Sequence, residues 1–101
     1  MAKKVLWSAF TDNMDACFIT GRYGVERHHI IGKTSHNKRL CEKYGYIVPL
    51  IPRLHPNGAW ADAEGRALDI PLKQMAQRHY EEHYGTREDF IREFGKSYLE
   101  D

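Results

Sequence analysis

The sequence predicts an α+β fold, on three observations. Residues 25–31 and 46–51 are short apolar segments of strand length, bounded by turn-forming residues. Residues 68–84 carry apolar side chains at three- and four-residue spacing, which is typical of an amphipathic helix. A chain of 101 residues corresponds to one domain with a modest core. We therefore expect residues 1–101 to form a single domain.

Two segments precede the first predicted strand. Residues 4–10 are interpreted either as a short strand or as an apolar arm. Residues 13–24 are interpreted as turns on either side of a short strand, because Gly21 and Gly24 are turn-forming residues.

A short helix is predicted between the two strands, over residues 36–44. Gly45 follows it, in the position where a glycine commonly ends a helix in the left-handed conformation. The second strand, 46–51, comes next. Residues 53–65 are expected to form a loop, because Asn57 lies in a Pro-Asn-Gly turn sequence.

Two helices are predicted at the end of the chain. The helix over residues 68–84 is expected to end at Gly85. Thr86 and the acidic residues after it predict the capped start of a final short helix, and Gly95 predicts its end. The order of elements is thus strand, short helix, strand, loop, long helix, short helix.

Charge is nearly balanced overall but unevenly distributed. The chain has 15 basic and 14 acidic residues, a net charge of +1, whereas proteins that bind nucleic acid usually have a clear basic surplus. Between Arg22 and Arg53, however, only Glu26 and Glu42 oppose several lysines and arginines. The last third is rich in acids. We therefore expect the middle of the chain to face a phosphate backbone.

Membrane and secretory signals are not predicted. No segment approaches the roughly 20 apolar residues that span a bilayer. The apolar run near the start of the chain is too short for a signal peptide. Two cysteines are too few for a disulfide framework, so Cys17 and Cys41 are interpreted as reduced thiols rather than as a bridge. These features predict a cytoplasmic protein without a membrane partner.

Histidines are the residues most suggestive of chemistry. His28 and His29 are adjacent on the first predicted strand, where neighbours point to opposite faces. Either the two meet different partners, or a local bulge brings both to one site. Asn37 lies in the following segment, and His55 follows the second strand. The remaining histidines are interpreted as structural or surface groups: His36, His79 and His83.

The pattern of these residues resembles that of the HNH (ββα-metal, His-Me finger) endonucleases. It consists of a histidine pair, an asparagine and a later histidine, spread over about thirty residues among strands. The similarity is to small HNH-like proteins of bacteriophages and prophages, and it runs from about Cys17 to Leu99. It is carried by Cys17 to Arg22, the histidine pair, Glu42 to Gly45, and Phe90 to Leu99. The resemblance implies a ββα-metal core over about residues 17–84, with a C-terminal helical extension over residues 86–99.

The resemblance also implies roles and partners. His29 corresponds to the general base that activates water, and His28 and His55 correspond to ligands of a divalent metal ion such as Mg²⁺ or Mn²⁺. Asn37 corresponds to the residue that holds the loop orienting the base. The expected substrate is nucleic acid, most simply DNA, cut at a phosphodiester. An imidazole suits both tasks, since it is neutral near pH 7 and serves as base or ligand.

The chain departs from this family where relatives carry a structural zinc. The two cysteine knuckles of those relatives correspond here to residues 17–20 and 51–54, which retain only Cys17. One thiolate cannot form a closed tetrahedral site, so no structural zinc is expected, and Ile51 and Leu54 are predicted to fill the space with apolar packing. The alternative function is a catalytically reduced HNH scaffold that binds nucleic acid or a host protein, for example to inhibit a bacterial defence system.

Overall fold

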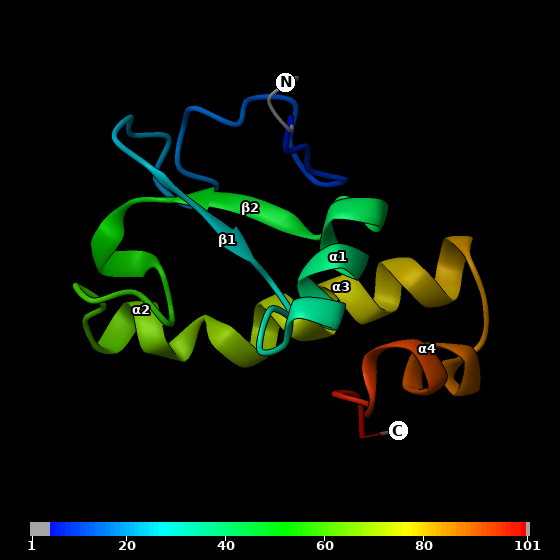
Figure 1. Ribbon diagram of the computed structural model, residues 1–101. Helices are drawn as coiled ribbons and strands as arrows, with labels where there is room; N and C mark the ends of the chain where they lie inside the picture. Colours follow the sequence, from blue (N-terminus) through cyan, green and yellow to red (C-terminus); the bar gives the residue numbers. More distant parts are fainter. Residues whose placement is uncertain (1–4, 101) are drawn as a thin grey trace.

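A computed structural model describes residues 5–100 and shows an α+β fold, which confirms the predicted class. Figure 1 shows the two strands above the long helix α3, with α1 and α4 near the end where β1 finishes. The elements in chain order are β1 (Glu26–His29), α1 (Ser35–Tyr44), β2 (Ile47–Leu50), the 3-10 helix η1 (Pro52–Leu54), α2 (Ala63–Ala67), α3 (Asp69–His83) and α4 (Arg87–Phe94).

The two predicted strands pair as an antiparallel unit. His28 lies opposite Val48 and His29 opposite Ile47. Every residue of β2 is buried, which explains why that segment reads as a continuous apolar run instead of an alternating one. In β1 only His28 is buried, while Glu26 and Arg27 are exposed. The sheet therefore brings a polar strand end next to a fully apolar strand.

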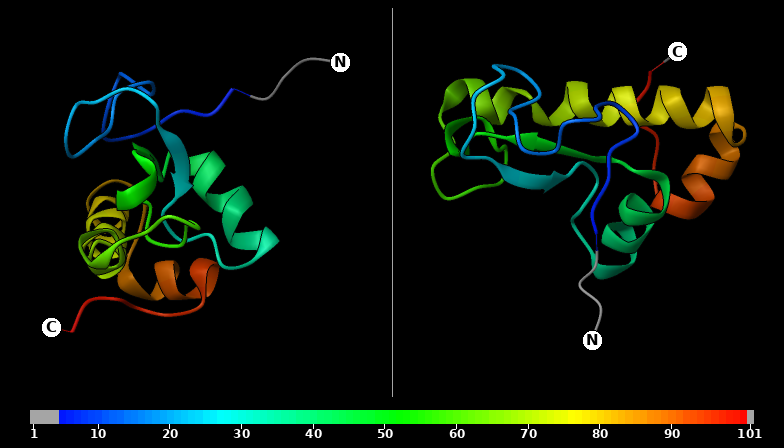
Figure 2. Two further views of the ribbon diagram at one scale, coloured as in Figure 1. Left: turned by 90° about the vertical axis from the view of Figure 1, so that its left-hand side faces the viewer. Right: turned by 90° about the horizontal axis from the view of Figure 1, so that it is seen from above.

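The long helix packs beneath the sheet. Leu72, Ala76 and Tyr80 of α3 belong to the same buried apolar cluster as β2. Tyr46, just before β2, places its hydroxyl 3.1 Å from Nδ1 of His79. Seen from above, α3 runs along β2 (Figure 2). No helix within residues 5–100 has the length and apolar character needed to cross a membrane.

The segment before β1 contains turns but no strand. Residues 5–10, the described part of the predicted segment 4–10, form an arm across the end of α1, where the indole Nε1 of Trp7 donates to the carbonyl of Glu42 at 2.9 Å. The strand predicted within 13–24 is wrong. The amide of Cys17 bonds the carbonyl of Arg22 at 2.7 Å, so the segment closes on itself as a turn and does not form a ladder.

The expected loop over residues 53–65 is partly helical, which corrects that prediction. It contains most of η1 and the start of α2. The side chain of Asp62 caps α2 by accepting from the amide of Gly65 at 2.9 Å. A Cβ at Gly65 would lie 2.2 Å from the carbonyl oxygen of Arg53, so close backbone packing fixes this short helix. Its five residues are too few for a periodic signal in the sequence.

The last helix is fastened to the rest of the fold by buried polar contacts. Thr86 and Asp89 form the predicted capping box at the start of α4, and Gly95 ends it. The hydroxyls of Tyr44 in α1 and Tyr80 in α3 both donate to the carboxylate of Glu93 in α4. One acceptor therefore joins three helices.

Candidate active site

Three of the histidines singled out in the sequence converge on one cavity beside β1. The cavity has a volume of about 230 Å³. Its walls come from β1, the turn after it, α1, and the segment after η1. The lining residues are Arg27, His28, His29, Gly32, Lys38, His55 and Asn57.

His28 is a buried imidazole with an unused nitrogen. It is 2% exposed. Within the described chain, its Nε2 has no hydrogen-bond partner. Burial, and then the nearby His55, lower the pKa of His28 to about 4, so the ring is neutral at pH 7. Most buried polar atoms are paired, so this free nitrogen needs an explanation, and a neutral imidazole is the form that binds a metal.

His55 faces His28 and is oriented from behind. The two rings are nearly edge-to-face, with centroids 4.9 Å apart. Nδ1 of His55 lies 2.7 Å from Oε1 of Glu26. An ionised carboxylate only accepts hydrogen bonds, so Nδ1 donates to it, and in the neutral tautomer with this contact Nε2 keeps the lone pair. Histidine ligands of metals are commonly oriented by a carboxylate in this way.

His29 is oriented by a second carboxylate. Its Nε2 lies 3.1 Å from Oε2 of Glu42 in α1, and both side chains are mostly buried. By the same reasoning Nε2 donates to Glu42, and in the neutral tautomer with this contact Nδ1 is the proton acceptor. A half-buried imidazole backed by a carboxylate is a suitable general base.

The histidine pair occupies one cavity although neighbours on a strand point apart. β1 ends at His29, and the chain turns at Ile30 and Ile31. Gly32 permits this turn, because a Cβ there would lie 2.8 Å from Cβ of His29. Each alternative that the sequence left open holds in part. The two rings line one cavity, but they meet different partners, His55 and Glu42, and the register of β1 contains no bulge at the pair.

Asn37 lies elsewhere. Its backbone amide donates to Oγ1 of Thr34, which caps α1, and its side-chain Nδ2 donates to the carbonyl of Phe94 at 3.3 Å. Asn37 does not line the histidine cavity, whereas Asn57 does. A role for Asn37 in holding the loop stays a prediction; the direct contact to His29 comes from Glu42.

Sequence reasoning missed the two carboxylates. Glu26 precedes His28 by two residues and so shares its side of the strand, a signal that was present in the sequence. Glu42 comes from α1, thirteen residues after His29. Nothing local to the strand indicates it, because its position depends on how α1 packs against β1.

Two imidazoles, those of His28 and His55, are the candidate metal ligands. The described residues hold no group of three or more His, Cys, Asp or Glu that fits a metal ion. A divalent ion held by His28 and His55 would take water and substrate oxygens as its other ligands. One of these imidazoles is neutral by burial and the other is oriented by Glu26.

Residues 17–20 and 51–54, the segments compared with zinc knuckles in the sequence, contain a single thiol. Cys17 is a buried free thiol, as is Cys41. Burial raises the pKa of the Cys17 thiol, but hydrogen bonds from the Thr20 hydroxyl and from nearby backbone amides, including that of Ile51, outweigh burial and lower it. Leu54 is buried in the core and Ile51 packs against it. The two segments thus lie side by side around one thiol.

The rim of the histidine cavity is basic. Arg27 and Lys38 are both exposed there, and Arg27 is paired with Asp15 at 2.9 Å. A positive rim favours the approach of an anion such as a phosphate.

In the comparisons with known proteins, no family model, curated protein or solved structure matches the chain.

Proposed function

We propose that this chain is an HNH-type, metal-dependent endonuclease acting on nucleic acid, most simply DNA. The observation that supports it best is the convergence of His28, His29 and His55 on one cavity, with a carboxylate behind each of two of them. The antiparallel strand pair with a helix packed beneath it is consistent with a ββα-metal module. The basic rim suits a phosphodiester.

In this proposal His29 is the general base. Its Nδ1 takes a proton from the water that attacks phosphorus, and Glu42, hydrogen-bonded to Nε2, stabilises the imidazolium that forms. The contact with Glu42 also fixes the direction of the ring. Lys38 at the rim offers a cation to a non-bridging phosphate oxygen.

His28 and His55 would hold the divalent ion, with Glu26 orienting His55. When bound, such an ion stabilises the negative charge that develops on the phosphate and on the leaving oxygen. Imidazole ligands favour ions such as Ni²⁺ or Zn²⁺, whereas Mg²⁺ prefers oxygen ligands. We therefore expect stronger activation by Ni²⁺ or Zn²⁺ than by Mg²⁺.

The test is cleavage of fluorescent single-stranded and hairpin DNA with Mg²⁺, Mn²⁺, Ni²⁺ or Zn²⁺. His29→Ala should lower the rate by about a hundredfold to ten-thousandfold, the contribution of a general base. His83→Ala is the matched control, because His83 is an exposed histidine on α3 that does not line the cavity. Circular dichroism should show that both variants remain folded.

His28→Ala and His55→Ala should instead weaken metal binding, so that excess metal partly restores cleavage. An inactive wild-type protein with all four ions on both substrates would refute the proposal. Equal rates in wild type and His29→Ala would assign any cleavage to a contaminant or another site.

A second candidate is a binding protein on the same scaffold, without cleavage. It is favoured by the lack of a three-residue metal-ligand group within residues 5–100. Such a protein would bind nucleic acid, or a host protein such as a component of a bacterial defence system. Retained DNA binding in an inactive wild-type protein, or capture of a defined host partner, would support it.

A further inference from the structure

A second, larger cavity adjoins the histidine cavity. Its volume is about 470 Å³, and the two cavities share Gly32 and Asn57 as lining residues. The remaining lining residues are Ile31, Lys33, Lys73 and Tyr98. Because they share a wall, a ligand that fills the larger cavity lies beside the histidines.

The two cavities differ in what they can hold. Pockets for small organic ligands usually measure about 300–1,000 Å³. At about 230 Å³ the histidine cavity falls below that range and suits a phosphate with an ion and water. At about 470 Å³ the neighbouring cavity lies within it and has room for a nucleotide.

The larger cavity has two cations and an aromatic ring. Lys33 is exposed at its edge. Lys73 is held in place, because its Nζ lies 3.0 Å from Oδ2 of Asp69 and 5.2 Å from the centre of the Tyr98 ring. Proteins that bind single-stranded nucleic acid combine basic groups along the backbone with aromatic rings on which bases stack.

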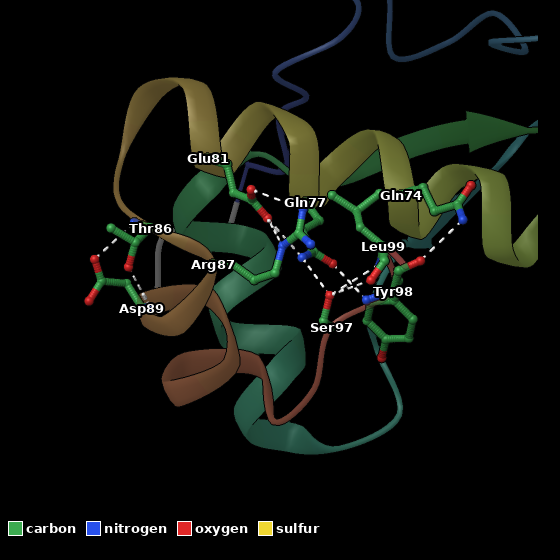
Figure 3. Close-up of polar contacts among 9 residues, drawn as sticks. All are labelled: Gln74, Gln77, Glu81, Thr86, Arg87, Asp89, Ser97, Tyr98 and Leu99. Atoms are coloured by element: carbon green, nitrogen blue, oxygen red, sulfur yellow. Dashed lines mark hydrogen bonds and ion pairs between the residues drawn. The ribbon is translucent and has the colours of Figure 1, made fainter. Parts of the chain in front are cut away.

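Tyr98 reaches the cavity because the C-terminal segment is fastened to α3 (Figure 3). Its amide donates to Oε1 of the buried Gln77 at 2.7 Å, and its carbonyl accepts from Nε2 of Gln74 at 3.1 Å. Nε2 of Gln77 also donates to the hydroxyl of Ser97 at 2.9 Å. These contacts involve only the backbone of Tyr98. Its ring contacts Phe90, with ring centroids 6.4 Å apart, and the ammonium groups of Lys73 and Lys96 lie over it.

We infer that this cavity binds the unpaired nucleotide next to the scissile phosphate of a single strand. Lys33 and Lys73 contact the phosphate of that nucleotide, and Tyr98 packs against its base. A base engaged in a duplex is covered by its neighbours and cannot present its face to the ring. The inference rests on the proposed nuclease function and specifies its substrate as single-stranded.

The test measures binding, not cleavage. A 5′-fluorescein-labelled thymidine octamer is titrated with the full chain in EDTA, and Kd is measured by fluorescence anisotropy at several salt concentrations. Loss of one phosphate contact in Lys33→Gln should reduce the slope of log Kd against log salt by about 0.7, the value for single strands. Lys43→Gln removes an exposed lysine that lines neither cavity, and its slope should match wild type.

Tyr98→Leu should weaken octamer binding on the order of tenfold, the effect of losing one stacked base. The variant keeps the backbone contacts to Gln74 and Gln77, so thermal unfolding should show an intact fold. A labelled hairpin duplex should bind wild type more weakly than the octamer and should be insensitive to Tyr98→Leu.

The inference would be overturned if Lys33→Gln kept the wild-type salt dependence and Tyr98→Leu kept the wild-type affinity. It would also be overturned if the hairpin bound more tightly than the octamer, or if the octamer did not bind. Because the assay contains no metal, its result is independent of catalysis. Octamer binding that responds to both variants in a chain that cleaves nothing would refute the nuclease and leave the nucleotide site standing.

Discussion

Burial of neutral His28 should make the stability of the metal-free protein depend on pH. The folded-state pKa of about 4 lies below the ordinary 6.5, so between these values the unfolded chain binds more protons. The contribution is complete above pH 6.5 and is lost as the pH falls towards 4. Over the whole window it amounts to about 3 kcal/mol, and about 2 kcal/mol is already lost at pH 5.

The perturbation is His28→Phe, which keeps a buried ring but removes the titrating group. Urea unfolding in EDTA at pH 7 and pH 5 gives the free energy of unfolding of each protein. Carboxylates titrate alike in both, so the difference between them isolates His28. Wild type should lose about 2 kcal/mol more than His28→Phe between the two pH values.

A control keeps the comparison interpretable. His83→Phe removes an exposed histidine from α3 and should follow the pH dependence of wild type. If wild type and His28→Phe lose equal stability on acidification, His28 is not buried in the neutral form. The account of His28 as a preformed neutral ligand would then be wrong.

Two further predictions concern stability, measured by urea unfolding. Glu93→Leu removes the acceptor of the Tyr44 and Tyr80 hydroxyls and should lower the free energy of unfolding by about 3 kcal/mol. The control Glu88→Leu, on the exposed face of the same helix, should lower it far less. Equal losses in the two variants would contradict the contact. Gly45 and Gly95 both have positive φ, but only at Gly45 would an added Cβ meet other atoms, 2.7 Å from the Trp7 ring. Gly45→Ala should therefore lower the free energy of unfolding by at least about 2 kcal/mol more than Gly95→Ala.

The regular elements were predictable because each has a local signal. The observed strands lie within 25–31 and 46–51, and α3 matches 68–84 to within one residue at each end. Glycines mark helix ends: Gly45 has φ 76° and Gly95 has φ 103°, values that other residues rarely adopt. Periodicity and glycine placement are properties of neighbouring residues, so one sequence is enough to see them.

The candidate site was predictable only in part. The three histidines stood out by residue type, but the carboxylates that orient two of them did not. Glu42 reaches His29 only after α1 packs against β1, and Asn57 reaches the cavity only after the segment following η1 folds back. Tyr98 is a still more distant case, since it reaches its cavity through contacts to α3. Such proximity depends on tertiary structure, which local patterns do not encode.

The carboxylate of Glu93 has a consequence for how the molecule opens. Because α1, α3 and α4 share this one acceptor, none of them can detach without leaving a buried hydroxyl or carboxylate unpaired. Their amides should therefore exchange with solvent as one cooperative unit, at a free energy close to that of global unfolding. Lys38 of α1 lines the histidine cavity and Lys73 of α3 lines its neighbour, so each cavity has a wall that belongs to this cooperative unit.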